Sequence, residues 1–136
     1  MKTTFHLSLP CLDVEETRNF YGGIEGVRFG RSSTNWLDVD LYGHQLTFNA
    51  SGRFSFEYPN YSFEKHVLPA FHFGVILSGS DWERLYSSVR EGAGEEEKNF
   101  LSSRKGAHRS FFLTDPNGYV LEFKSFVNPQ EVFSAD

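Results

Sequence analysis

The order of expected strands and helices repeats once along this chain of 136 residues, and that repeat limits the folds it can adopt. The first half predicts a strand at 5–9, a helix at 13–24 and three short strands at 27–31, 36–42 and 44–49. The strands are predicted from apolar residues at every second position, with Phe5 on the apolar side of the first, and the helix from an N-cap at Asp13 followed by Glu16. The order is therefore βαβββ.

The same order restarts at Ala70, with a strand at 70–77, a helix at 80–92 and strands at 98–103, 108–114 and 119–126. The capping box of Ser80 and Glu83 marks the predicted helix start, and the run Asp-Pro-Asn-Gly at 115–118 predicts a hairpin turn. Half a chain of this size cannot bury its sheet face alone. We therefore expect one α+β domain built from two tandem βαβββ modules, with module one at 1–50, a linker at 51–69, module two at 70–127 and a tail at 128–136.

The linker has no helical period, yet it is rich in aromatic residues, namely Phe54, Phe56, Tyr58, Tyr61 and Phe63. Loops of this length are usually functional or disordered, and the aromatic content argues against disorder. Two interpretations stay open: the segment packs against the sheet or a second subunit, or it forms a lid over a substrate pocket.

The charge and cysteine content of the chain limit the binding partners and the cellular compartment that we expect. Thirteen Lys and Arg against eighteen Asp and Glu give a net charge of -5, and the basic residues are scattered, which argues against nucleic-acid binding. The N-terminal segment is too polar for a signal peptide or a membrane span, and Cys11 has no second cysteine to pair with. We expect a cytoplasmic protein with a small-molecule substrate and with neither a membrane nor a nucleic-acid partner.

Strand alternation places four side chains of metal-ligand type on faces opposite the apolar residues. His6 lies on the first strand of the first half and Gln45 on its last strand, while His72 and Glu122 occupy the equivalent strands of the second half. If each half curves so that these faces form one trough, the four side chains converge. Two imidazoles and one carboxylate are the ligand set of non-haem Fe(II) oxygenases and also suit Mn, Ni, Co or Zn.

The alternative is that each histidine is a hydrogen-bonded structural residue and that Glu122 is a solvated carboxylate. We expect ordinary structural or solvated roles for the other three histidines: His44 on the core parity, His66 in the linker and His108 at a strand start. Three further polar residues face the predicted trough by parity and are expected either to contact substrate or to be simply exposed: Asp38, Asp40 and Tyr42.

Four segments together resemble the vicinal oxygen chelate superfamily, which includes glyoxalase, extradiol dioxygenase and bleomycin-resistance proteins. They are FHLSLPCLDVEETRNFYGGIEGVRFG, WLDVDLYGHQLTFN, PAFHFGVIL and FFLTDPNGYVLEFKSF, and they span nearly the whole chain. The resemblance implies a glyoxalase-like fold, in which paired βαβββ modules form a curved mixed sheet around a cleft. It also implies that His6, His72 and Glu122 are metal ligands, with Gln45 at the fourth place.

The resemblance leaves three functions open. The first is a metal-dependent, dioxygenase-like enzyme, with Fe(II) favoured, whose small substrate chelates the metal through adjacent oxygens; Phe112, however, stands where extradiol enzymes typically carry a tyrosine. The second is a glyoxalase-like isomerase or lyase using Ni, Co, Mn or Zn, in which Glu122 doubles as the catalytic base, although Gln45 replaces the usual carboxylate. The third is a metal-free, bleomycin-resistance-like binding protein. Paired-module proteins commonly dimerise, so we also expect a homodimer.

Overall fold

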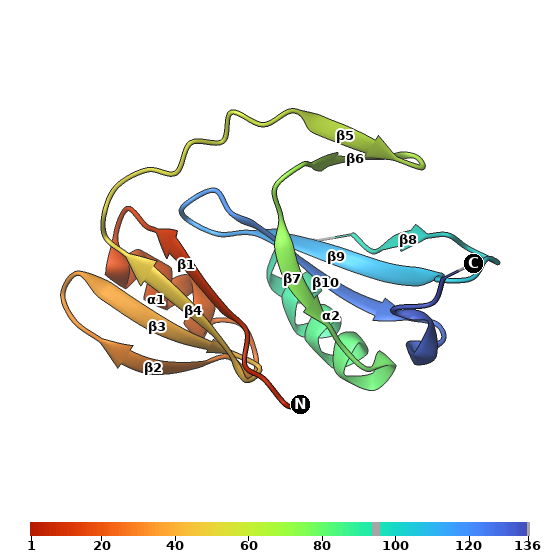
Figure 1. The fold of residues 1–136 in the computed structure, drawn as a ribbon, viewed down its shortest axis with the longest axis horizontal. Helices are drawn as coiled ribbons and strands as arrows, with labels where there is room; N and C mark the ends of the chain where they lie inside the picture. Colours follow the sequence, from red (N-terminus) through yellow and green to blue (C-terminus); the bar gives the residue numbers. More distant parts are fainter. Residues whose placement is uncertain (94–95, 136) are drawn as a thin grey trace. The chain divides into compact units, whose positions relative to one another are not determined.

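A computed structural model describes residues 1–93 and 96–135 as two compact units. The first unit comprises Met1–Glu57 with Asp115–Gly118, and the second comprises Tyr58–Thr114 with Tyr119–Asp136. Each unit contains a mixed sheet of four strands and one α-helix, which confirms the predicted α+β class (Figure 1).

The first unit has the predicted order of one strand, one helix and three strands. Its elements are β1 (His6–Pro10), α1 (Val14–Gly22), β2 (Arg28–Ser32), β3 (Trp36–Leu41) and β4 (His44–Asn49). The strands lie in the order β1-β4-β3-β2, with β1 parallel to β4 and the other pairs antiparallel. Leu37, Val39, Leu46 and Phe48 are buried, as strand alternation predicts.

Two residues that alternation places on the apolar side are exposed instead. Phe5 retains 60% of its accessible surface, and His44 is also exposed. Both lie at one end of the sheet, because β1 begins only at His6 and β4 begins at His44, directly after the turn at Tyr42 and Gly43. Strand parity predicts which face a residue lies on, but it does not predict whether another element covers that face.

Helix α1 begins as its sequence predicts. The Asp13 Oδ1 atom accepts a hydrogen bond from the Glu16 backbone N–H at 2.8 Å, which is the geometry of an N-cap. The helix buries Val14, Thr17 and Tyr21, and the Tyr21 ring packs against the Phe48 ring with 5.1 Å between centroids. One helical face therefore forms the core of this unit with β4.

The predicted turn at 115–118 is present, and it supplies buried polar groups to the first unit. The Gly118 N–H donates to the Asp115 carbonyl at 3.1 Å, and Gly118 adopts a φ of +94°, which favours glycine. The Asp115 Oδ2 atom accepts from the Tyr21 hydroxyl at 3.0 Å, and the Asn117 amide donates to the Thr17 hydroxyl at 3.1 Å. The turn is thus anchored to two side chains of α1.

Cys11 is fully buried and forms no disulfide. Burial raises the pKa of its thiol, because the thiolate would lose its solvation in the apolar interior. The thiol therefore stays protonated and serves as a small apolar residue of the core.

The second unit repeats the βαβββ order. Its elements are β7 (Phe73–Ile76), α2 (Gly79–Ala93), β8 (Lys98–Phe100), β9 (His108–Thr114) and β10 (Val120–Phe126), and a 3-10 turn, η1 (Pro129–Glu131), follows. The strands lie in the order β7-β10-β9-β8, with β7 parallel to β10. Trp82 of α2 donates its indole N–H to the Phe123 carbonyl of β10 at 2.9 Å, which fixes the helix against the sheet.

The N-cap of α2 lies two residues before the predicted one. The hydroxyl of Ser78, rather than that of Ser80, accepts from the Asp81 backbone N–H at 3.2 Å, and the Ser78 carbonyl accepts from Trp82 at 2.9 Å. Glu83, which the capping box assigned to the helix start, instead pairs with Arg109 of β9. Ser78 is therefore the N-cap, because its hydroxyl accepts a hydrogen bond from a backbone N–H of the first helical turn.

The linker contains regular structure that the sequence analysis did not predict. Residues Asn60–Phe63 form β5 and His66–Pro69 form β6, an antiparallel hairpin that is a sheet of its own. The two residues between these strands are Glu64 and Lys65, and Glu64 has a φ of 55°. Two-residue hairpin turns are normally predicted from Asn or Gly at the turn positions, and this turn contains neither residue.

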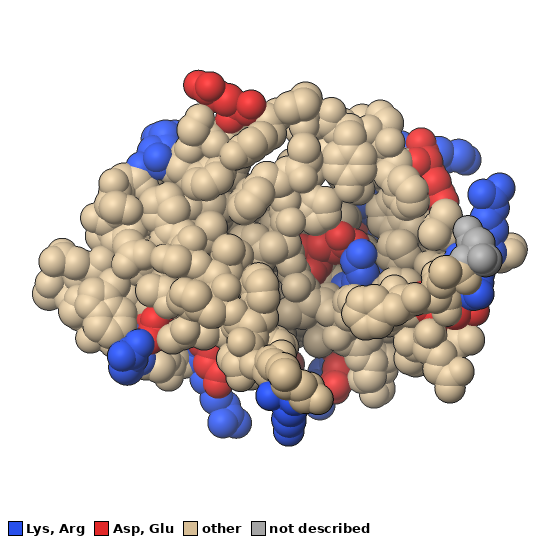
Figure 2. All heavy atoms as spheres, in the orientation of Figure 1, with Lys and Arg blue, Asp and Glu red and all other residues tan. Residues whose placement is uncertain are grey.

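No helix in residues 1–93 and 96–135 is long and apolar enough to cross a membrane. On the face that Figure 2 shows, lysine and arginine side chains lie in separate spots among acidic and uncharged residues rather than in one basic patch.

Gly74 of β7 allows the close approach of β7 to β10, because a Cβ atom there would lie 1.7 Å from the backbone oxygen of Glu122. We expect Gly74→Ala to lower the free energy of unfolding by at least about 2 kcal/mol, since backbone must move to admit the methyl group. Chemical denaturation measures this change. Gly79→Ala is the matched control, because a Cβ atom at Gly79 meets nothing within 4 Å; equal stabilities of the two variants would contradict the prediction.

Candidate functional site

The pairing of β7 with β10 brings two predicted ligands together. Glu122 is the register partner of Gly74, and His72 lies two residues before Gly74, directly ahead of β7 rather than inside it as predicted. The His72 Nε2 atom lies 3.2 Å from the Glu122 Oε1 atom. The two side chains retain only 18% and 9% of their accessible surface, so bulk water screens the pair weakly.

The hydrogen bonds of His72 fix which ring nitrogen carries a proton. The Nδ1 atom lies 2.9 Å from the Pro69 carbonyl oxygen, which only accepts hydrogen bonds, so Nδ1 is the donor. In the neutral imidazole, Nε2 then presents a lone pair to the Glu122 carboxylate. Two lone pairs facing each other repel unless a proton or a metal cation lies between them.

Glu122 is held from its other side. Its Oε2 atom accepts a hydrogen bond from the Ser110 hydroxyl of β9 at 2.6 Å and lies 3.6 Å from the Lys124 ammonium. This leaves Oε1 as the oxygen that faces His72. Ser110 is fully buried, so the carboxylate orientation is set by the core of the sheet.

These two donors have the spacing of two neighbouring ligands on one divalent metal ion. Two ligands at right angles, each about 2.1 Å from an ion, lie about 3.0 Å apart, close to the 3.2 Å between Nε2 and Oε1. Metal-binding histidines usually donate their second ring N–H to a carbonyl or carboxylate, as His72 does to Pro69. His72 and Glu122 would hold the ion, and Ser110 would orient the carboxylate.

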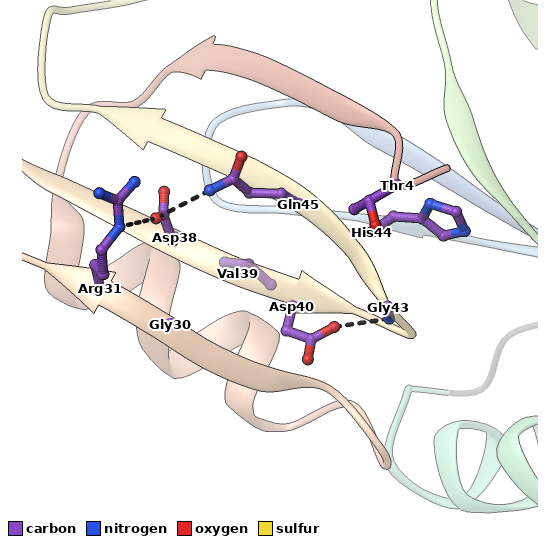
Figure 3. Close-up of a pocket in the computed structure, with 9 residues that line it drawn as sticks. All are labelled: Thr4, Gly30, Arg31, Asp38, Val39, Asp40, Gly43, His44 and Gln45. Atoms are coloured by element: carbon purple, nitrogen blue, oxygen red, sulfur yellow. Dashed lines mark hydrogen bonds and ion pairs between the residues drawn. The ribbon is translucent and has the colours of Figure 1, made fainter. Parts of the chain in front are cut away.

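The other two predicted ligands are neighbours in the first unit. His6 of β1 and Gln45 of β4 are register partners in the parallel pair, and His6 is exposed. The Gln45 Nε2 atom donates to the Asp38 Oδ2 atom at 3.1 Å (Figure 3), so the amide oxygen is the atom left to bind a metal.

Asp38 is buried, with 4% of its surface accessible, although it lies on the side of β3 opposite the apolar residues. Its carboxylate accepts hydrogen bonds from Gln45 and from the Arg31 Nε atom at 3.2 Å (Figure 3). It also accepts one from the Thr47 hydroxyl at 2.7 Å. These three donors offset the cost of burying the charge. Simple surface exposure, one of the two expectations for Asp38, is therefore wrong.

Asp38 and Gln45 line a cavity of about 320 Å³ in the first unit, together with Arg31, Asp40 and His44 (Figure 3). The Asp40 Oδ1 atom accepts from the Gly43 N–H at 2.7 Å and so holds the β3–β4 turn. Tyr42 is not among the residues that line this cavity; its hydroxyl donates to the Glu25 carbonyl at 2.7 Å.

The second unit has a pocket of about 360 Å³ that includes His72 and Glu122. Its other lining residues are Tyr61, Phe63, Leu68, Phe100, His108 and Lys124. The Tyr61 ring is parallel to the His72 ring within 13°, with centroids 6.3 Å apart, and the Phe63 and Phe100 rings stack at 5.4 Å. The β5–β6 hairpin therefore supplies part of an aromatic wall beside the His72–Glu122 pair.

Two basic side chains of this pocket, those of Lys124 and His108, were not selected as site residues from the sequence. Lys124 shares the strand parity of Glu122, and that signal was sufficient to place it beside the carboxylate. His108 lies between the Phe100 and Phe126 rings and donates its Nδ1–H to the Gly106 carbonyl at 2.9 Å. No sequence pattern separates this histidine from a solvated one at a strand start. His66, by contrast, packs its ring edge-on against Phe100, as a structural role predicts.

The structure thus places the four predicted ligands as two pairs, His6 with Gln45 and His72 with Glu122. Within the residues described, no three His, Cys, Asp or Glu side chains form a group that could hold a metal ion.

Comparison with solved structures defines the fold class. The chain is similar to a glyoxalase/bleomycin resistance protein/dioxygenase from Alicyclobacillus acidocaldarius, with 25% identity over 96% of both chains and a TM-score of 0.78. A glyoxalase/dioxygenase from Nostoc punctiforme gives 18% identity over 93% of this chain and 92% of that one, with a TM-score of 0.61. The fosfomycin resistance protein FosX from Listeria monocytogenes gives 12% identity over 92% of this chain and 93% of that one, with a TM-score of 0.58.

These solved proteins are members of the vicinal oxygen chelate superfamily, so the structure confirms the resemblance inferred from the sequence and the glyoxalase-like fold. Members of the superfamily generally use divalent metals. A scan against protein-family models finds no match. A search of curated proteins finds none either.

Proposed function

We propose that this chain is a metal-dependent enzyme of the vicinal oxygen chelate type, acting on a small substrate through two adjacent oxygens. The observation that carries the proposal is the His72–Glu122 pair, in which the Nδ1–H bond to Pro69 leaves a lone pair of Nε2 facing a carboxylate oxygen at 3.2 Å. A divalent cation relieves that repulsion and uses both donors.

In this proposal His6 and Gln45 complete the ligand set, and the two pairs meet on one ion either within one chain or between two copies. The bond from the Gln45 amide to Asp38 supports the assignment, because it directs the amide oxygen, the better ligand atom, away from the carboxylate. Two neutral imidazoles, one amide and one carboxylate around a divalent ion leave a charge of +1. A chelating anion is therefore the favoured ligand.

Two observations favour a dioxygenase-like activity over an isomerase. The walls beside His72 and Glu122 carry Tyr61, Phe63 and Phe100, which suit an aromatic diol. Both oxygens of Glu122 are engaged, one facing His72 and the other bonded to Ser110, so the carboxylate is poorly placed to act as a mobile base. When bound, an Fe(II) ion would supply a Lewis acid that orients the two substrate oxygens.

The metal assignment is tested by metal content and affinity. We expect protein purified without chelators to carry a divalent metal, and His72→Ala or Glu122→Gln to weaken binding at least about 100-fold, since even changes beyond the direct ligands cost 10–100-fold. Titration calorimetry with Mn²⁺ or Zn²⁺ measures the affinity. His66→Ala is the control, because His66 packs on Phe100 and lies outside the ligand set. Unchanged affinity in the His72 and Glu122 variants would remove both residues from the site.

The reaction type is tested separately. We expect Fe(II)-loaded protein to consume oxygen in the presence of a catechol and to leave a hemithioacetal unchanged under anaerobic conditions. Oxygen electrode traces and product absorbance follow the two reactions. Conversion of the hemithioacetal without oxygen uptake would replace the dioxygenase proposal by the isomerase one, and a metal-free protein that binds the diol would favour sequestration.

A further inference from the structure

We propose that Lys124 is the specificity-determining residue of the second unit's pocket, and that the substrate is an aromatic vicinal diol carrying a separate carboxylate. The inference rests on the proposed function, because the diol oxygens are assigned to the metal. It goes beyond that function in naming the third recognition point of the ligand and the side chain that provides it.

Lys124 is placed in the pocket by strand alternation. It follows Glu122 by two residues on β10, so both side chains lie on the face opposite Leu121 and Phe123. Its side chain retains 28% of its accessible surface, and its Nζ atom lies 3.6 Å from Glu122 Oε2. That distance is too long for a hydrogen bond, and Oε2 already accepts the shorter bond from Ser110 at 2.6 Å.

The charge balance around Lys124 changes when a cation binds. Within the described part of the chain, Glu122 is the one acidic group paired with this ammonium. A divalent ion bound to Glu122 neutralises the carboxylate charge. The Lys124 ammonium then has no counter-ion among the pocket residues. Glu122 and Lys124 cancel, so the loaded pocket carries the +2 of the metal. A ligand with one chelating anion leaves a positive charge uncompensated, whereas a ligand with an additional carboxylate balances it.

The remaining walls restrict the rest of the ligand. Tyr61, Phe63, Leu68 and Phe100 offer rings and methyl groups, which favour a flat apolar body between the two charged ends. The volume of about 360 Å³ lies near the lower end of the usual range for small-molecule pockets, which suits a ligand built on a single ring. A charged, single-ring diol satisfies the metal, the ammonium and the aromatic walls together.

The test compares the binding of catechol and 3,4-dihydroxybenzoate to the full chain loaded with Zn²⁺, which does not change oxidation state. We expect the carboxylated diol to bind wild-type protein roughly tenfold more tightly than catechol. Lys124→Met should abolish that preference, so that the two diols bind the variant equally, and Lys124→Arg should retain it. Lys98→Met is the matched control, because Lys98 lies over the Phe112 ring and outside the pocket. Thermal unfolding of each variant reports whether it folds.

The outcomes separate the two proposals. If both diols bind Zn²⁺-loaded protein equally, and Lys124→Met changes neither affinity, the role of Lys124 is wrong and the proposed function stands. If neither diol binds the loaded wild-type protein, the proposed function itself is wrong, and the substrate inference falls with it. Loss of the carboxylate preference in the Lys98 variant would also overturn the assignment to Lys124.

Discussion

The hydrogen bond from His72 Nδ1 to the Pro69 carbonyl determines the chemistry of the candidate site. It settles the tautomer of the ring, and so makes Nε2 the atom with a lone pair to offer. Glu122 Oε1 faces that atom at 3.2 Å in a mostly buried setting. Two electron-rich atoms in such a position require a proton or a metal cation between them, and the charge proposals for the pocket follow from the case of the metal.

The fold supplies this geometry through the parallel pairing of β7 with β10. The pairing sets Glu122 opposite Gly74, and the missing Cβ atom of Gly74 admits the β10 backbone at close range. Ser110, from the next strand, holds the second carboxylate oxygen. The first unit pairs β1 with β4 in the same parallel sense and sets His6 opposite Gln45. The repeat seen in the sequence is therefore also a repeat of paired candidate ligands.

Much of this arrangement was predictable, because it depends on local rules. Strand alternation assigned the faces of Glu122 and Gln45, and the turn residues at 115–118 indicated the hairpin. The β5–β6 hairpin was missed because its turn lacks Asn and Gly. The surface exposure considered for Asp38 and the burial expected for Phe5 were wrong, because burial depends on tertiary neighbours. Three hydrogen-bond donors surround the Asp38 carboxylate, and Phe5 is exposed at the end of the sheet.

The most direct test of the account is a crystal structure of the protein soaked with Zn²⁺, with diffraction recorded at the zinc absorption edge. The account predicts an anomalous peak about 2.1 Å from both His72 Nε2 and Glu122 Oε1. At saturating Zn²⁺, an absence of anomalous density beside these two atoms would contradict it, as would a His72 ring turned so that Nε2 meets the Pro69 carbonyl.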